Sequence, residues 1–371
     1  MNKLFLALIV LTSIACKTSR PSKSKQNTYE FLVGTYTQKG SKGVYFASFN
    51  PAESIVKIVS NTEQIESPSF LDFDKNQKHI YAVSETDAGS VEALAFDKTI
   101  GKIQKINAQP SGGAHPCHIT IDATGKWVFT GNYTGGTLGL LPINEDGSLG
   151  APVQIIQHYG NGPNTARQEK PHVHSVNISP DNRNLFVADL GTDEIVNYAF
   201  DSEKGHLSEV QRIRVSAGSG PRHFTFHPVL PYAYVIQELT GKVTQFLYQN
   251  GKITPIDEVS TLPPDFKGNN SCADLHFSPD GKFLYGSNRF YDTIVRFSVN
   301  QTNGKLEQID QTSVKGKVPR NFAITPDGKY MMVANQNTDN IVIFKLENGK
   351  MIDAGLELPV SMPVCVKFLK N

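Results

Sequence analysis

The sequence has no excess of charge of either sign and no apolar run long enough to cross a membrane. Its 371 residues include 36 Lys and Arg against 35 Asp and Glu, without a run of basic residues. This balance argues against a nucleic-acid partner. The apolar stretch at residues 4–14 is shorter than the roughly 20 residues that a membrane-spanning helix needs. We therefore predict no nucleic-acid partner and no ordinary membrane span.

Cysteine is scarce as well. The four cysteines are Cys16 near the N-terminus and Cys117, Cys272 and Cys365 in the body of the chain. An odd number of cysteines cannot all pair within one chain. The last three lie near the start of apolar strands in repeats that are not neighbours, so we expect buried free thiols that pack as small apolar side chains.

The N-terminus is typical of an export signal. Lys3 precedes the apolar stretch at residues 4–14, and Ala15 and Cys16 follow it. A small residue directly before cysteine resembles a bacterial lipoprotein signal. We predict a signal peptide at residues 1–16, lipidation of Cys16, and a flexible tether at residues 17–28. The protein would then be exported to the cell envelope or periplasm and touch the membrane only through its lipid anchor. The alternative is a plain secretory signal that is cleaved nearby.

What the sequence does contain is a repeat. Six stretches share a polar or proline start, an apolar run, a turn such as Pro-Asp-Gly-Lys, and a second apolar run that ends in Asn, Asp or Gln. The clearest copies are residues 272–288 and 319–335, and the others begin at Pro68, Pro116, Val173 and Pro221. The period of roughly 44 to 57 residues is typical of a β-propeller, a solenoid or another repeat array.

Each repeat holds four strands. A third apolar run follows the hairpin, as at residues 195–200 and 341–346, and a fourth follows a polar turn, as at residues 251–259. Four antiparallel strands with tight turns make one propeller blade. Residues 362–368 match only the first strand of the repeat, whereas residues 31–36 and 43–49 match only later strands. We predict an all-β, seven-bladed β-propeller at residues 29–371, closed by pairing of the C-terminal strand with the N-terminal strands.

This architecture predicts where the chemistry lies. The first strand of each blade lines the channel, and its start meets the end of the second strand at one mouth. The hairpin spacing places His174 opposite Leu190, Arg222 opposite Glu238, and Arg320 opposite Gln336. The polar residues expected at this mouth are His115, His118, His174, Arg222, His223, Asp274, Arg289, Arg320, Asn321, Asn132, Asp189, Glu238, Asn288 and Asn335. A ring rich in Arg and His suits a small anionic ligand. For any one of these residues, the alternative is a hydrated turn or a cap.

One connection between repeats is longer than the others. Residues 158–174 lead directly into a first strand, so they must lie over the same mouth. Long loops of this kind often serve as lids. Arg167, Gln168 and His172 favour this interpretation over a disordered surface loop.

Two segments resemble motifs of the seven-bladed lactonase family. They are residues 162–181, with Gly-Pro, Arg167-Gln168 and Pro171-His-Val-His174, and residues 220–224, with Gly-Pro-Arg-His-Phe. That family contains propeller-type 6-phosphogluconolactonases and carboxymuconate cyclases. The resemblance implies a lactone hydrolase in which His174, Arg222 and Glu238 are catalytic. The family pattern contains one further arginine from a later blade. In this sequence it corresponds to Arg320, and Arg289 is the alternative match. The substrate-binding residues that we predict are Arg320, Arg167, His118, His223 and Arg289.

Lactone hydrolysis needs a base that activates water and a donor for the oxyanion. Glu238 or His174 could be the base, and Arg222 could stabilise the oxyanion or bind a carboxylate. The histidines lack a metal-ligand spacing, so we predict no metal and no cofactor. We expect a monomer that acts on a small anionic compound or sugar lactone, phosphorylated or not. The alternatives are a lactonising cyclase and a non-catalytic propeller that binds a ligand or partner, although the single tryptophan, Trp127, argues against an aromatic binding face.

Overall fold

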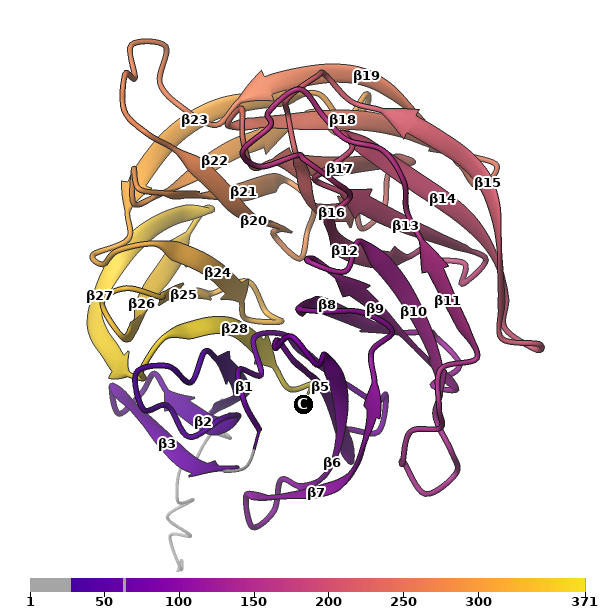
Figure 1. The fold of residues 1–371 in the computed structure, drawn as a ribbon. Helices are drawn as coiled ribbons and strands as arrows, with labels where there is room; N and C mark the ends of the chain where they lie inside the picture. The colour runs from indigo at the N-terminus through magenta and orange to yellow at the C-terminus, as the bar shows by residue number, and fades with distance from the viewer. Residues whose placement is uncertain (1–27, 63–64, 371) are drawn as a thin grey trace, which may run out of the picture.

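The computed structural model describes residues 28–62 and 65–370, and within these ranges it contains 28 strands and no helix. The strands form seven four-stranded antiparallel sheets that surround a central channel (Figure 1). The predicted all-β, seven-bladed propeller is therefore confirmed. The predicted signal peptide, Cys16 and nearly all of the tether lie outside the described residues. Within the described part of the chain, no helix has the length and apolarity that a membrane crossing requires.

The blades follow one another in sequence order, and each runs from an innermost to an outermost strand. Blades 1 to 3 consist of β4 (Leu71–Phe73), β5 (His79–Ser84), β6 (Ser90–Asp97) and β7 (Lys102–Pro110); β8 (Pro116–Ile121), β9 (Trp127–Asn132), β10 (Thr137–Pro142) and β11 (Gln154–Gln157); and β12 (Val173–Ile178), β13 (Asn184–Asp189), β14 (Glu194–Asp201) and β15 (His206–Arg214). Blades 4 and 5 consist of β16 (Pro221–Phe226), β17 (Tyr232–Gln237), β18 (Lys242–Gln249) and β19 (Lys252–Ser260); and β20 (Ser271–Phe277), β21 (Phe283–Arg289), β22 (Thr293–Val299) and β23 (Leu306–Ser313). Blade 6 consists of β24 (Pro319–Ile324), β25 (Tyr330–Asn335), β26 (Asn340–Glu347) and β27 (Lys350–Pro359).

Blade 7 joins the two ends of the chain. Its strands are β28 (Pro363–Phe368), β1 (Tyr29–Thr35), β2 (Tyr45–Asn50) and β3 (Ile55–Asn61), in that order from the channel outward. The antiparallel register pairs Phe31 with Phe368 and Gly34 with Cys365, and yellow β28 lies beside indigo β1 in Figure 1. This pairing confirms the predicted closure and removes the exposed edges that an open sheet would present.

The turn residues of the repeat explain its hairpins. In blade 5, Ser278 Oγ donates to Asp280 Oδ1 at 2.7 Å, and Gly281 takes a positive φ of 69°. Thr325, Asp327 and Gly328 repeat this arrangement in blade 6. Such short polar side chains bond within the turn, and glycine adopts the left-handed conformation without steric cost. These turns fix which ends of the first two strands face the functional mouth.

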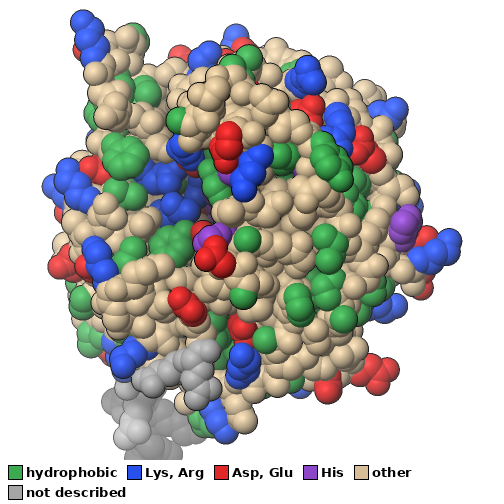
Figure 2. Space-filling view, in the orientation of Figure 1, with side chains coloured by type: hydrophobic (Ala, Val, Ile, Leu, Met, Phe, Trp, Pro, Cys, Tyr) green, Lys and Arg blue, Asp and Glu red, His purple; other side chains and the backbone are tan. Residues whose placement is uncertain are grey.

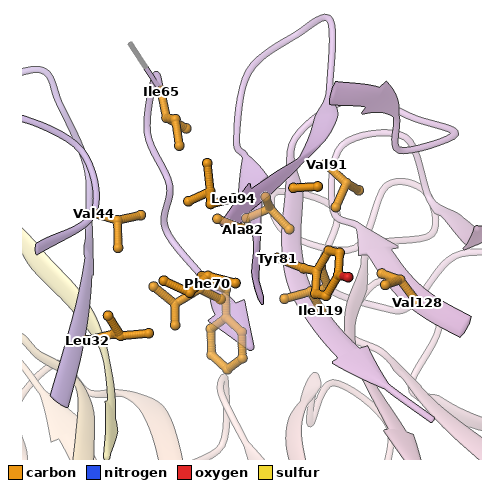
Figure 3. Close-up of a cluster of buried hydrophobic side chains, with 14 of the residues drawn as sticks. Leu32, Val44, Ile65, Phe70, Tyr81, Ala82, Val91, Leu94, Ile119 and Val128 are labelled. Carbon is orange, nitrogen blue, oxygen red and sulfur yellow. The ribbon is translucent and has the colours of Figure 1, made fainter. Parts of the chain in front are cut away.

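Apolar side chains fill the spaces between neighbouring blades. Figure 3 shows one of these clusters, in which Leu32 and Val44 of blade 7 meet Leu94 of blade 1, with Ile119 and Val128 of blade 2 beyond. All five side chains are at most 1% exposed. The three body cysteines are free and buried, which confirms the expectation for them. The blades are therefore held face to face as a rigid wall around the channel.

The innermost strands carry a recurring irregularity that the hairpin spacing did not predict. In blade 4 the ladder pairs Pro221 with Gln237 and His223 with Ile236, so Arg222 is an extra residue in a β-bulge. The prediction that Arg222 pairs directly with Glu238 was therefore wrong in register. Equivalent bulges occur in blades 2, 3, 5, 6 and 7. A bulge frees one side chain from the ladder and redirects it, here toward the channel.

Candidate active site

Two sets of residues meet at the channel mouth. One set comes from the start of the first strand of each blade, and the other from the end of the second strand. The first set, which we call the bulge ring, consists of Ser69, Cys117, His174, Arg222, Ala273, Arg320 and Val364. The second set, which we call the exit ring, lies at or just after the end of each second strand and consists of Tyr36, Glu85, Tyr133, Leu190, Glu238, Arg289 and Gln336. Each blade thus contributes two side chains to the mouth.

A cavity of about 200 Å³ lies among these rings, lined by Glu85, Cys117, Tyr133, Arg167, His174, Glu238, Arg289 and Arg320. A narrower void adjoins it and is lined in part by Ser69, Arg222 and His223. Figure 2 shows Lys and Arg side chains gathered in a hollow on this face. The cavity is smaller than the roughly 300–1,000 Å³ of pockets for drug-sized ligands, so it suits one small molecule.

Glu238 is the centre of the charge arrangement. Its carboxylate accepts from Arg222 Nε at 3.0 Å and from Arg167 Nη2 at 2.5 Å, and Arg289 Nη2 lies 2.9 Å away. Glu238 is 3% exposed. Burial opposes its ionisation, but the charges of Arg289, Arg222 and Arg167 outweigh burial and hold the pKa of Glu238 below its usual range. Glu238 is therefore firmly ionised and weakly basic.

Arg320 differs from the other three arginines. It lines both the cavity and the narrower void, and its guanidinium lies over the ring of Tyr36, 5.4 Å from the centroid. Among the described residues, no carboxylate lies within ion-pair distance of Arg320. Its donors therefore face the cavity, where they can bind an anionic group.

His174 and Cys117 both line the cavity. His174 is 3% exposed, and its Nδ1 lies 3.8 Å from Cys117 Sγ. Burial and then the positive charge of Arg222 hold the pKa of His174 well below its usual value. His174 is therefore neutral at physiological pH and can accept a proton. Burial raises the pKa of the Cys117 thiol, which keeps that thiol protonated and a poor nucleophile.

The long connection between blades 2 and 3 reaches the site as predicted. Arg167 extends from it to Glu238 and donates to the hydroxyl of Tyr133 at 3.3 Å. Gln168, which is fully buried, fixes the segment by donating to the Leu190 carbonyl and to Asp193. The segment is therefore held against the rim, with Arg167 over the cavity.

The structure places His118 and His223 one step deeper in the channel. The His118 ring stacks on Phe70 at 4.3 Å. His223 Nε2 accepts from Arg222 Nη1 at 3.0 Å, so its Nδ1 carries the proton that it donates to Asp274 at 2.7 Å. Burial and Arg222 lower the pKa of His223 to about 4. The neutral imidazole therefore acts as a support beneath Arg222.

Glu85, like Tyr133, lines the cavity and was missed by the sequence analysis. It belongs to the exit ring, and both of its carboxylate oxygens accept from the hydroxyl of Tyr36, at 3.0 and 3.1 Å. Glu85 follows Ser69 by 16 residues, the same spacing that separates Arg222 from Glu238. Applying this spacing to the first repeat would have found it.

The described residues contain no group of three or more His, Cys, Asp or Glu side chains that could hold a metal ion. A hollow of about 540 Å³ is lined by residues 76–78, 95–99, 102 and 104 of blade 1. Residues 76–78 form the turn at the far end of the first hairpin, so this hollow lies away from the mouth. The cavity between the two rings is the place where chemically active side chains converge.

Comparison with known proteins gives consistent results over the whole ring. A family model described as "Lactonase, 7-bladed beta-propeller" matches residues 30–368. A Bacillus subtilis protein named 6-phosphogluconolactonase is 35% identical over 346 residues, covering 92% of this chain and 98% of that protein. A Formosa agariphila protein of the same name is 37% identical, covering 89% and 96%. The solved structure of the Pseudomonas aeruginosa periplasmic gluconolactonase has a TM-score of 0.87 at 31% identity, covering 93% and 99%.

Proposed function

The chain belongs to the seven-bladed β-propeller lactonase family, and we propose that it hydrolyses a small sugar lactone, either the anionic 6-phosphogluconolactone or an unphosphorylated relative such as the neutral gluconolactone. The membership confirms the resemblance seen in the sequence motifs. The observation that carries the proposal is the convergence of neutral His174, the unpaired donors of Arg320 and the Glu238 cluster on one small cavity.

Charge favours an anionic substrate. Arg167, Arg289 and Arg320 line the cavity, and Arg222 lies directly behind Glu238. Glu238 and Glu85 supply at most two negative charges against these four. The excess positive charge attracts a phosphate or carboxylate and also the oxyanion that forms during the reaction. The side chain of Arg167 is 40% exposed at the rim, where it can contact a group that extends out of the cavity.

The proposed hydrolysis begins with water beside His174. Neutral His174 takes a proton from this water, whose oxygen attacks the lactone carbonyl carbon. Arg222 and Arg320 supply positive charge where the carbonyl oxygen becomes an oxyanion. The carboxylate of Glu238 is engaged by three arginines, which stabilise its ionised form. Its proposed role is to fix Arg222 and Arg289 in position.

We also propose that the protein is exported and anchored through Cys16. The sequence of residues 1–16 supports this proposal, as does the resemblance to a periplasmic gluconolactonase. An exported enzyme would meet unphosphorylated lactones more readily than cytoplasmic sugar phosphates. Labelling with palmitate, compared between the wild-type protein and Cys16→Ser, tests the anchor. Sedimentation of the soluble part tests the predicted monomer.

The test of the activity is hydrolysis of a lactone panel. Purified protein is assayed with the anionic 6-phosphogluconolactone and with two neutral lactones, glucono-1,5-lactone and δ-valerolactone, against the spontaneous rate. We expect catalysed hydrolysis, with the highest kcat/KM for an anionic lactone. His174→Gln should lower kcat by about 10²- to 10⁴-fold. His206→Gln, on the exposed outer strand β15, is the matched control and should change nothing.

A folded wild-type protein without excess hydrolysis on any lactone overturns the proposal. Ring closure of a carboxymuconate in the same preparation would then identify a lactonising cyclase. Ligand binding without turnover would instead identify a non-catalytic propeller.

A further inference from the structure

We propose that Glu85 is the general acid of this site and that its carboxyl group gives a proton to the ring oxygen that leaves when the lactone opens. This inference rests on the proposed lactone hydrolysis. It adds a second proton-transfer group to His174 and gives the two glutamates of the cavity different roles.

Glu85 lies on the opposite side of the channel from Glu238. The two residues occupy the same position of the repeat, as their backbone contacts show: Glu85 N donates to the Ser67 carbonyl, and Glu238 N donates to the Gly220 carbonyl. Blades 1 and 4 are three positions apart in a ring of seven, which is the largest separation that the ring allows. A substrate in the cavity can therefore have one glutamate on each side.

The surroundings of the two carboxylates are opposite in character. Glu238 has three arginine partners. Glu85 has hydroxyl partners, Tyr36 at 3.0 and 3.1 Å and the Oγ of Ser69. Among the described residues, no Lys, Arg or His lies within ion-pair distance of Glu85. The hydroxyls of Tyr36 and Ser69 stabilise the Glu85 carboxylate by hydrogen bonds, but they place no countercharge beside it.

The electrostatics agree with this geometry. Removal from bulk water raises the pKa of Glu85, and the charge of Arg320 and the hydrogen bonds from Ser69 and Tyr36 only partly oppose this effect. The pKa of Glu238 is shifted the other way. Two carboxyl groups whose environments move their pKa values apart are the usual arrangement for an acid and a charge-stabilising partner in one site.

The bond-breaking step of the reaction gives such a group a role. His174 removes one proton from water as the new C–O bond forms. When the tetrahedral intermediate collapses, the bond between the carbonyl carbon and the ring oxygen breaks, and that oxygen leaves as an alkoxide unless it is protonated. Glu85 gives its proton to this oxygen and becomes a carboxylate. The proton held by His174 then returns to Glu85 through water, and the net reaction consumes one water molecule.

The experiment compares Glu85→Gln and Glu85→Asp with the wild type on the lactone that the wild type hydrolyses best. Glutamine keeps the shape and can still accept from Tyr36 and Ser69, but it cannot supply the proton. Kinetics are measured as kcat and KM across pH. Glu53→Gln, on the exposed turn between β2 and β3, is the matched control. Infrared difference spectra between the wild type and Glu85→Gln report a protonated carboxyl group independently of turnover.

We expect Glu85→Gln to lower kcat by about 10²- to 10⁴-fold with little change in KM. Wild-type kcat should fall as pH rises and Glu85 loses its proton, and this alkaline limb should be absent in the variant. The infrared band of a protonated carboxyl should disappear in Glu85→Gln.

Unchanged kcat and an unchanged alkaline limb in a folded Glu85→Gln overturn the assignment of Glu85 while leaving lactone hydrolysis intact. If the wild type itself shows no excess hydrolysis, the proposed function fails instead. If Glu85→Gln does not fold, Glu85→Asp decides, because a repositioned acid must shift the alkaline limb and an unshifted limb contradicts the proposal.

Discussion

Replacing Glu238 with glutamine should destabilise the whole ring, because this carboxylate holds three arginines together. Arg222 and Arg289 are 2% and 7% exposed, and Glu238 is 3% exposed. The substitution keeps the side-chain volume but leaves two buried guanidinium groups without a countercharge. Like charges at short distance in a site of low dielectric repel each other strongly.

The magnitude follows from the burial of the partners. Removing one member of a buried ion pair costs about 3–5 kcal/mol of unfolding free energy. Arg167 adds little, because its side chain is 40% exposed and such pairs are worth at most about 1 kcal/mol. For a ring of this size, the cost corresponds to a fall in Tm of about 4–7 °C.

The assay is thermal and denaturant unfolding followed by circular dichroism. Glu258→Gln is the matched control, since Glu258 pairs with Lys242 at 2.5 Å on the outer strands with side chains 22% and 44% exposed. That control should cost about 0–1 kcal/mol. Adding Arg289→Gln to Glu238→Gln should recover part of the loss, because the double variant removes one of the unpaired charges.

The contribution of Glu238 to the stability of the folded protein depends on pH in one direction. The pKa of Glu238 in the folded protein lies below the ordinary value of 4.5. Its contribution to stability is therefore fully present above pH 4.5 and is lost as the pH falls toward the folded-state pKa. The difference in Tm between the wild type and Glu238→Gln should narrow in acid. A Glu238→Gln protein as stable as the Glu258→Gln control at pH 7 would refute the reasoning.

Three further predictions concern binding and catalysis. Arg320→Met keeps an apolar side chain over Tyr36 but removes the hydrogen-bond donors. The kcat/KM for an anionic lactone should therefore fall by about 10- to 100-fold, and the kcat/KM for δ-valerolactone should fall less. An equal loss on both lactones would contradict anion binding by Arg320. Arg167→Gln should raise KM while changing the unfolding free energy by at most about 1 kcal/mol, and a larger loss in denaturant titrations would show that the rim segment is a structural element. Because burial and Arg222 lower the pKa of His174, kcat should fall only as pH drops well below 6.5; an acid limb above 6.5 in the kcat–pH profile would exclude His174 as the base.

The architecture could be predicted from the sequence because each repeat is identified by its turn residues and by the alternation of apolar and polar residues in its strands. The Pro-Asp-Gly-Lys turns around Gly281 and Gly328 mark the hairpins wherever they occur. The partial repeats at the two ends imply closure. The same hairpin spacing brought Arg222 near Glu238 and Arg320 near the mouth. These inferences need only local pattern and the period of two in a strand.

Other properties of the site depend on contacts that no local pattern encodes. The bulge at Arg222 adds one residue to a strand without changing its composition, so the register was wrong although the two side chains do meet. The contacts of Arg167, Arg222 and Arg289 with one carboxylate involve blades 4 and 5 and the rim segment. Glu85 was missed because the first repeat has a Lys-Asn-Gln-Lys turn in place of the marker turn, although its spacing from Ser69 is the same.

The pairing of β28 with β1 also sets the timing of folding during synthesis. Residues 29–35 leave the ribosome long before residues 363–368, which form the innermost strand of the same blade, so this blade cannot be completed until residues 363–368 have emerged. Until then the nascent chain can build separate blades but no closed toroid. Because Arg320 and Val364 belong to β24 and β28, the mouth of the channel is completed only when these late strands have emerged. A ring that closes late is compatible with the export that we propose, because the chain cannot complete its fold early in synthesis.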